Sequence, residues 1–266
     1  MENVSKALII AGGMLIAIMV ISLIIVLWNQ MSGYFAEQHS ATIVEQIAEF
    51  NAQFENYNGK DIRGNELISV MNKVVNYNRT YSDMENYERI IIKIDLDGHQ
   101  NDFKYNSSDN SIFPNQSLIT NEHGDDVIEN ISNLSNILVS EAINAGITGI
   151  NDTKLQKLSA DIDNIVEKTV SDFEDTNGVA TAQQKLEAYK EARAKKLKSI
   201  LGYEVNDAEL SKIIKATRRY YQYTQFKRAM FKCTGVTYDT TNGRVNGITF
   251  KVVTTTDYDG THIKFN

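Results

Sequence analysis

Residues Ala7–Trp28 read ALIIAGGMLIAIMVISLIIVLW and contain no charged side chain. About 20 apolar residues, rising 1.5 Å each, span the roughly 30 Å hydrocarbon core of a bilayer. The apolar region of a secretory signal peptide is shorter, about 7–15 residues, and ends at a small-residue cleavage site. A core helix of a soluble protein is seldom apolar on every face for so many turns. The stretch therefore predicts a retained helix at 7–28 that crosses a membrane or packs in a filament core.

Basic residues next to the apolar stretch set its expected orientation. Lys6 precedes it, and the next basic residue along the chain is Lys60. Because cytoplasmic flanks are enriched in Lys and Arg, this asymmetry places the N-terminus inside and the rest of the chain outside. We therefore expect a short cytoplasmic leader at 1–6 and a single-pass membrane protein with an external head, or an extracellular filament that carries the same head.

Small residues recur within the apolar stretch, and Gly13 and Ala17 are four positions apart. Such a spacing lets two helices approach closely, although glycine is also common in membrane helices generally. The residues expected to pack between helices during assembly are Ala7, Ala11, Gly12, Gly13, Ala17 and Ser22.

The chain continues beyond Trp28 with an amphipathic pattern over 29–58. Ile43, Ile47, Phe50 and Phe54 are spaced by 4, 3 and 4 residues, which places them on one side of a helix. The pattern predicts one long helix over residues 5–56, about 78 Å long at 1.5 Å per residue. We expect its second half to bury these four residues against the head, residues 59–266.

The apolar first half and amphipathic second half of this helix resemble the type IV pilin-like proteins. The resemblance covers residues 1–58 and concerns architecture only. It implies that the apolar half packs in a filament core and that the amphipathic half docks on a head. The processing motif of that group is absent, because a cut after Gly13 would place Ile18 where those proteins carry glutamate.

The head is expected to be α+β, with a small antiparallel sheet. Asp239–Gly243 contains an Asn-Gly turn between two β-branched runs, which is typical of a hairpin. The longest expected loop covers residues 106–124, and residues 103–105 are expected to return as a strand beside 87–96. Helices are expected over 65–76, 126–145, 154–170, 180–201 and 207–221, and the other strands over 231–238 and 245–253.

Catalytic, cofactor and metal sites are not expected, and neither is an enzyme. Cys233 is the single cysteine, and no nucleophile-elbow, phosphate-loop or dinucleotide motif occurs. Asp95 and Asp97 place oxygen ligands in one turn, but the EF-hand spacing is absent, so a polar turn is the simpler interpretation. Residues 122–126 (EHGDD) are similarly interpreted as a loop that leads into an acidic helix N-terminus.

Charge is unevenly distributed along the chain. The net charge is -7 and the isoelectric point is about 5.2, which argues against a dedicated nucleic-acid binder. Residues 185–232 nevertheless hold 13 basic and 5 acidic residues. This region is a solvated helical surface or contacts wall polymer, DNA or the acidic half of a neighbouring subunit. Its candidate contact residues are Lys195, Lys196, Lys198, Arg218 and Arg219.

Two functions fit these patterns. The first is a structural subunit of a pilin-like surface filament, whose partners are copies of itself, the membrane through residues 7–28, and secretion or assembly machinery. The alternative is a bitopic membrane protein whose external head binds a ligand or scaffolds a surface machine. The first requires protein against residues 7–28, and the second requires lipid.

Overall fold

The computed structural model describes residues 2–82, 88–122, 127–174 and 180–253, and the side chains of 2–11 and 32–41 are not described. The start of the expected strand at residue 87 and the 123–126 segment lie outside these residues. The chain divides into two compact units. The first comprises residues 1–53 with 242–244, and the second comprises 54–241 with 245–266.

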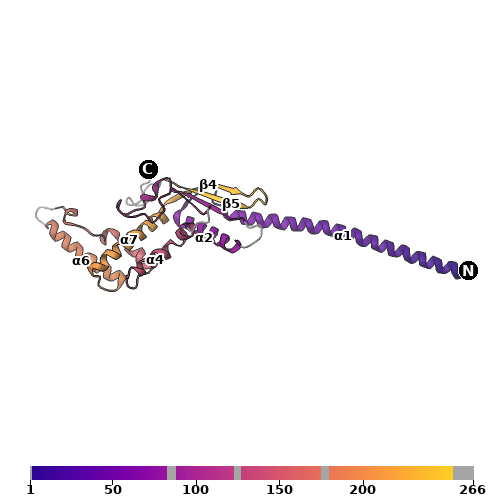
Figure 1. The fold of residues 1–266 in the computed structure, drawn as a ribbon, viewed down its shortest axis with the longest axis horizontal. Helices are drawn as coiled ribbons and strands as arrows, with labels where there is room; N and C mark the ends of the chain where they lie inside the picture. Colours follow the sequence, from indigo (N-terminus) through magenta and orange to yellow (C-terminus); the bar gives the residue numbers. More distant parts are fainter. Residues whose placement is uncertain (1, 83–87, 123–126, 175–179, 254–266) are drawn as a thin grey trace. The chain divides into compact units, whose positions relative to one another are not determined.

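The first unit consists mainly of one uninterrupted helix, α1 (Glu2–Glu55), of 54 residues (Figure 1). The expected long helix is confirmed. It continues without a break because it contains no proline and because Gly33 alone does not end it. Near its end, the Asn51 Nδ2 donates a hydrogen bond of 2.8 Å to the Gly243 carbonyl. The Arg244 guanidinium lies 5.0 Å from the centroid of the Phe50 ring. Residues 242–244 therefore contact the helix within this unit.

The second unit contains a five-stranded sheet in the order β1-β4-β5-β2-β3. The hairpin β4–β5 is confirmed, and its strands pair antiparallel. The pairing of β2 with β5 is parallel. The sheet is therefore mixed, whereas an antiparallel sheet was expected. A parallel pair needs a long crossover, and the helices between the two strands supply it. The strands are β1 (Asp61–Arg63), β2 (Ile91–Asp95), β3 (Leu118–Thr120), β4 (Met230–Tyr238) and β5 (Val245–Val253).

The neighbour of β2 at the sheet edge corrects a second expectation. Residues 103–105 do not form a strand, and β3 lies instead inside the stretch expected to be a loop. Phe103 is fully buried, with its ring 5.3 Å from that of Phe113 and 5.8 Å from that of Phe226 between centroids. The apolar residue that suggested a strand is thus a core anchor at the end of a turn.

Helices α2 to α7 also belong to the second unit. The helices expected over 65–76 and 207–221 continue to Tyr81 and Arg228, and two other expected ranges are corrected more strongly. The expected helix over 126–145 is interrupted at Asn133, and the one expected over 154–170 ends at Ala160 and is followed by two short 3-10 turns. Asn206 caps α7 by accepting a hydrogen bond of 2.9 Å from the Glu209 amide. The helices are α2 (Gly64–Tyr81), α3 (Val127–Ser132), α4 (Leu134–Asn144), α5 (Asp152–Ala160), α6 (Ala182–Leu201) and α7 (Asp207–Arg228), and the 3-10 turns are η1 (His99–Asn101), η2 (Ile162–Asn164) and η3 (Val170–Asp172).

The expected α+β class is confirmed, and the core of the second unit lies where strands and helices meet. Phe54, the last residue of the amphipathic stripe, is only 2% exposed and belongs to this unit. Ile43 is 42% exposed, and Ile47 and Phe50 are half-buried. Burial of these three residues against the head stays a prediction.

Candidate functional site

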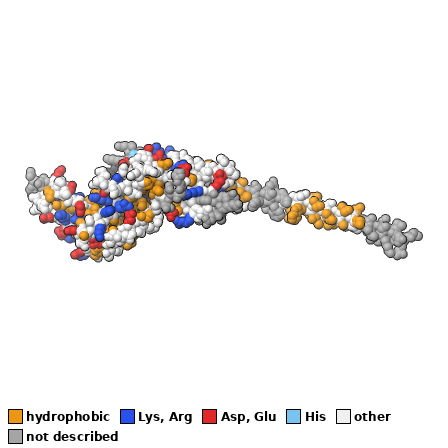
Figure 2. Space-filling view, viewed as in Figure 1, with side chains coloured by type: hydrophobic (Ala, Val, Ile, Leu, Met, Phe, Trp, Pro, Cys, Tyr) orange, Lys and Arg blue, Asp and Glu red, His pale blue; other side chains and the backbone are white. Residues whose placement is uncertain are grey.

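The most conspicuous surface is the apolar segment of α1. Gly12–Met31 has a mean hydropathy of 2.3, and none of it is buried. Among the described residues, this is the one helix long and apolar enough to cross a membrane. Figure 2 shows its hydrophobic side chains exposed along the helix.

The small residues of this segment are open on the surface. A Cβ atom built on Gly12 or Gly13 would meet no atom within 4 Å. Ala17 and Ser22 are exposed, whereas the side chains of Ala7 and Ala11 lie outside the described part of the chain. The two glycines therefore leave the helix backbone accessible to a partner that approaches closely.

The five basic residues named from the sequence are divided between two helices. On α6, Lys195 pairs with Glu191 at 2.7 Å, Lys196 with Asp161 at 2.9 Å and Lys198 with Glu204 at 2.8 Å. Each of these lysines thus has a carboxylate from its own head beside it. The positive charge on α6 is smaller than the count of basic residues indicates.

On α7, Arg218 and Arg219 are also paired. The Arg218 Nη1 lies 3.3 Å from Asp109, and Arg219 donates two hydrogen bonds, of 3.0 and 3.1 Å, to the carboxylate of Glu141 on α4. Such a two-pronged arginine–carboxylate contact has defined geometry. These two arginines therefore hold the loop before Phe113 and helix α4 in place on α7.

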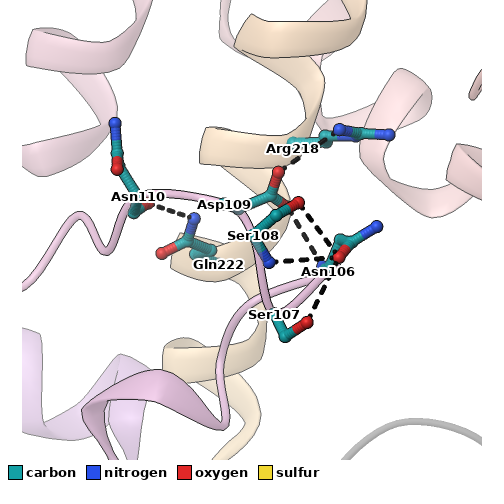
Figure 3. Close-up of polar contacts among 7 residues, drawn as sticks. All are labelled: Asn106, Ser107, Ser108, Asp109, Asn110, Arg218 and Gln222. Atoms are coloured by element: carbon teal, nitrogen blue, oxygen red, sulfur yellow. Dashed lines mark hydrogen bonds and ion pairs between the residues drawn. The ribbon is translucent and has the colours of Figure 1, made fainter.

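A polar loop, residues 106–112, lies against α7 (Figure 3). Gln222 is fully buried; its Oε1 accepts a hydrogen bond of 3.0 Å from the Ile112 amide, and its Nε2 donates one of 2.9 Å to the Asn110 carbonyl. Within the loop, the Asn106 Oδ1 accepts a hydrogen bond of 3.1 Å from the Ser108 amide, and the Asp109 carboxylate accepts one of 3.0 Å from the Asn106 amide. Gln222 of α7 and the loop's own side chains thus satisfy backbone groups of this loop.

Two hollows lie on either side of Lys215 and Arg219. One, of about 320 Å³, lies between the loop and α7 and is lined mainly by residues with polar side chains. The other, of about 370 Å³, lies between α4 and α7, and we call it the α4–α7 groove. The groove combines apolar residues with charged ones. It is lined by Leu138, Glu141, Ala142 and Ala145 of α4 and by Lys212, Lys215, Ala216 and Arg219 of α7.

Lys212 and Lys215 differ from the basic residues named from the sequence. Both are exposed, and neither forms an ion pair with any residue that the structure describes. They are three positions apart on α7, so they lie on one side of that helix. Sequence reasoning included them in the basic region but did not single them out, although the spacing i, i+3 was available as a signal.

Features that suggested metal or nucleophile chemistry have structural roles. The described residues contain no group of three or more metal-ligating side chains. Asp97 pairs with Lys251 at 3.1 Å, and Asp95 accepts a hydrogen bond of 2.8 Å from the Asp97 amide, so both carboxylates stabilise a turn. Cys233 is fully buried, and burial raises the pKa of its thiol, which keeps it protonated at neutral pH.

No protein-family model, curated protein or solved structure matches the chain. Three features of the molecule remain as indicators of function: the apolar segment of α1, the α4–α7 groove, and the loop held by Gln222.

Replacing Gln222 with leucine is expected to destabilise the head by about 1–3 kcal/mol, because the Ile112 amide and the Asn110 carbonyl would lose their partner in a buried site. Denaturant unfolding of the full chain in mild detergent measures this change. Gln183→Leu, at an exposed position on α6, is the matched control and is expected to change stability by less than about 0.5 kcal/mol. Equal midpoints for the two variants would contradict the anchoring role of Gln222.

Proposed function

We propose that this chain is a structural subunit of a pilin-like surface filament, assembled through its apolar N-terminal helix with the head exposed. The observation that carries the proposal is the exposed apolar segment Gly12–Met31, none of which is buried. Burying apolar surface is worth about 25 cal/mol per Å², so this segment needs either lipid or protein around it. A filament core supplies protein, and the membrane holds the subunit before assembly.

Two features favour protein as the final neighbour of the segment. Gly12 and Gly13 have open space where a side chain would be, which suits close packing between helices. The helix also continues without a break to Glu55, so each subunit presents one continuous rod that joins the apolar segment to the head sequence.

Lys6 before the segment favours an internal N-terminus and an external head.

The second candidate, a bitopic membrane protein with a ligand-binding head, is supported by the hollow of about 320 Å³ between the 106–112 loop and α7. Its lining is rich in hydrogen-bonding side chains, as a site for a polar ligand requires. In that case lipid would cover residues 12–31 permanently.

Electron microscopy of surface material sheared from cells tests the proposal. With antibodies against the head, we expect gold labels along thin filaments and protease-accessible head on intact cells. Labels confined to membrane vesicles, with no filament carrying the protein, would overturn the filament proposal and leave the bitopic alternative. A head that proteases reach only after lysis would overturn the orientation.

A further inference from the structure

We infer that the α4–α7 groove of one subunit binds the amphipathic part of α1, residues 42–53, of a neighbouring subunit. This inference rests on the proposed filament. It adds a contact between subunits that lies outside the apolar core and is recognised through both charge and shape.

The groove offers small apolar residues beside free positive charge. Ala142, Ala145 and Ala216 line it together with Leu138, so a helix backbone can approach the floor closely. Lys212 and Lys215 stand at its side with no carboxylate partner among the described residues. Glu141 is already engaged by Arg219, so it does not neutralise these lysines.

The proposed occupant carries the complementary pattern. Val44, Ala48 and Ala52 recur every four residues on α1, which places them along one side of the helix. Glu45 and Glu49 flank this row and are also four residues apart. All five side chains are exposed, and Val44 is 63% exposed. No ion pair links either glutamate to a residue in the described parts of the chain.

This row is distinct from the stripe that was expected to face the head. At 100° per residue, Val44, Ala48 and Ala52 average about 120° away from Ile43 and Ile47, so one helix can serve both contacts. The row consists mainly of alanines, and alanines also line the groove, so the two surfaces can approach each other closely.

Spacing strengthens the match between the two surfaces. Side chains three or four positions apart on a helix lie about 5–6 Å from each other, so Glu45 and Glu49 can face Lys212 and Lys215 as two pairs. An apolar row set into a groove with charges at the rim is a common mode of helix recognition. The lysines of α6 are poorer candidates, because Lys195, Lys196 and Lys198 already pair within their own head.

Reversing the charges on one surface, and then on both surfaces together, tests the docking in cells that produce the full chain. Lys212→Glu with Lys215→Glu, or Glu45→Lys with Glu49→Lys, is expected to lower filament yield at least about fivefold, because attraction at the rim becomes repulsion. All four changes in one chain are expected to restore most of the yield. Lys157→Glu with Lys190→Glu is the matched control on α5 and α6, because both lysines are exposed and form no ion pair among the described residues, and it is expected to leave the yield unchanged.

Cysteine cross-linking separates contacts between chains from contacts within one chain. One chain carries Ala48→Cys and a co-expressed second chain carries Ala216→Cys; the native Cys233 is buried and does not interfere. We expect a disulfide-linked heterodimer only when both are present. Glu187→Cys on α6 in place of Ala216→Cys is the control and is expected to give no dimer.

The outcomes distinguish this inference from the proposed function. The groove contact would be wrong if both double variants formed normal filaments. It would also be wrong if the fourfold variant did not regain its yield and no cross-link formed. Either result would leave the proposed filament unaffected. Loss of filaments from the Lys157→Glu, Lys190→Glu control alone would overturn the groove contact and place the contact at α5 and α6 instead. Absence of the protein from any filament in wild-type cells would overturn the filament, and the docking with it.

Discussion

On the proposed assembly through α1, replacing Gly13 with leucine is expected to abolish surface filaments while leaving the protein in the membrane at its normal level. Gly13 lies in the exposed apolar segment, and a Cβ atom there meets no atom within 4 Å in the single chain. A Cβ atom at Gly13 thus meets no other part of the chain, so the effect of the leucine is expected to arise at contacts with neighbouring chains. Close backbone approach supplies the dispersion energy of such a bundle, and a bulky side chain at the contact removes it.

Membrane insertion should survive this change, because leucine is more apolar than glycine on insertion scales. Ile18→Leu, in the same segment, is the matched control and should keep its filaments, since it preserves size and hydrophobicity. The measurements are immunoblots of membrane fractions and counts of labelled filaments per cell. Filaments of normal number that contain the Gly13→Leu protein would show that no close contact forms at this glycine.

Local patterns predicted the long helix and the hairpin well. The apolar run and the stripe of Ile43, Ile47, Phe50 and Phe54 gave α1 to within a few residues, because helix periodicity is a local property. The Asn-Gly turn at Asn242 fixed the β4–β5 pair for the same reason.

Long-range pairing was not available from such patterns. The parallel pairing of β2 with β5 joins strands separated by the whole helical region, and β3 has only three residues with no repeating pattern. Tertiary contacts decide both features. Phe103 shows the same limit, since an apolar residue next to a turn can belong to a strand or anchor the core.

At the candidate site, too, the sequence predicted some features and only the fold revealed the others. Composition located the basic region, but it could not show that Lys195, Lys196, Lys198, Arg218 and Arg219 each have a carboxylate partner. The partners Asp109 and Glu141 are distant in sequence, so only the fold brings them to α7. Lys212 and Lys215, which form no ion pair in the part of the chain that the structure describes, stand out once these pairs are known.

Replacing Gly64 with alanine is expected to cause the largest loss of stability in the head. Gly64 begins α2, and its amide donates a hydrogen bond of 2.8 Å to the Ala229 carbonyl. A Cβ atom at this position would lie 1.9 Å from the carbonyl oxygen and 2.8 Å from the carbonyl carbon of Phe226. Backbone atoms cannot rotate away as a flexible side chain can.

Relief of this clash would have to separate the start of α2 from the end of α7, and the Phe226 ring resists that movement because it packs 5.1 Å from Phe231 and 5.0 Å from Phe113 between centroids. Overpacking in a tight site typically costs about 1–3 kcal/mol, and contact with rigid backbone places Gly64→Ala at or above the upper end of that range. Gly235→Ala is the matched control, since its Cβ would meet no atom within 4 Å. Thermal unfolding of the full chain should show a clear fall in Tm for Gly64→Ala and almost none for Gly235→Ala. Equal Tm values for the two variants would mean that α2 and α7 leave room for a Cβ atom at Gly64. Packing around Phe226 would then not explain how the two helices are held together.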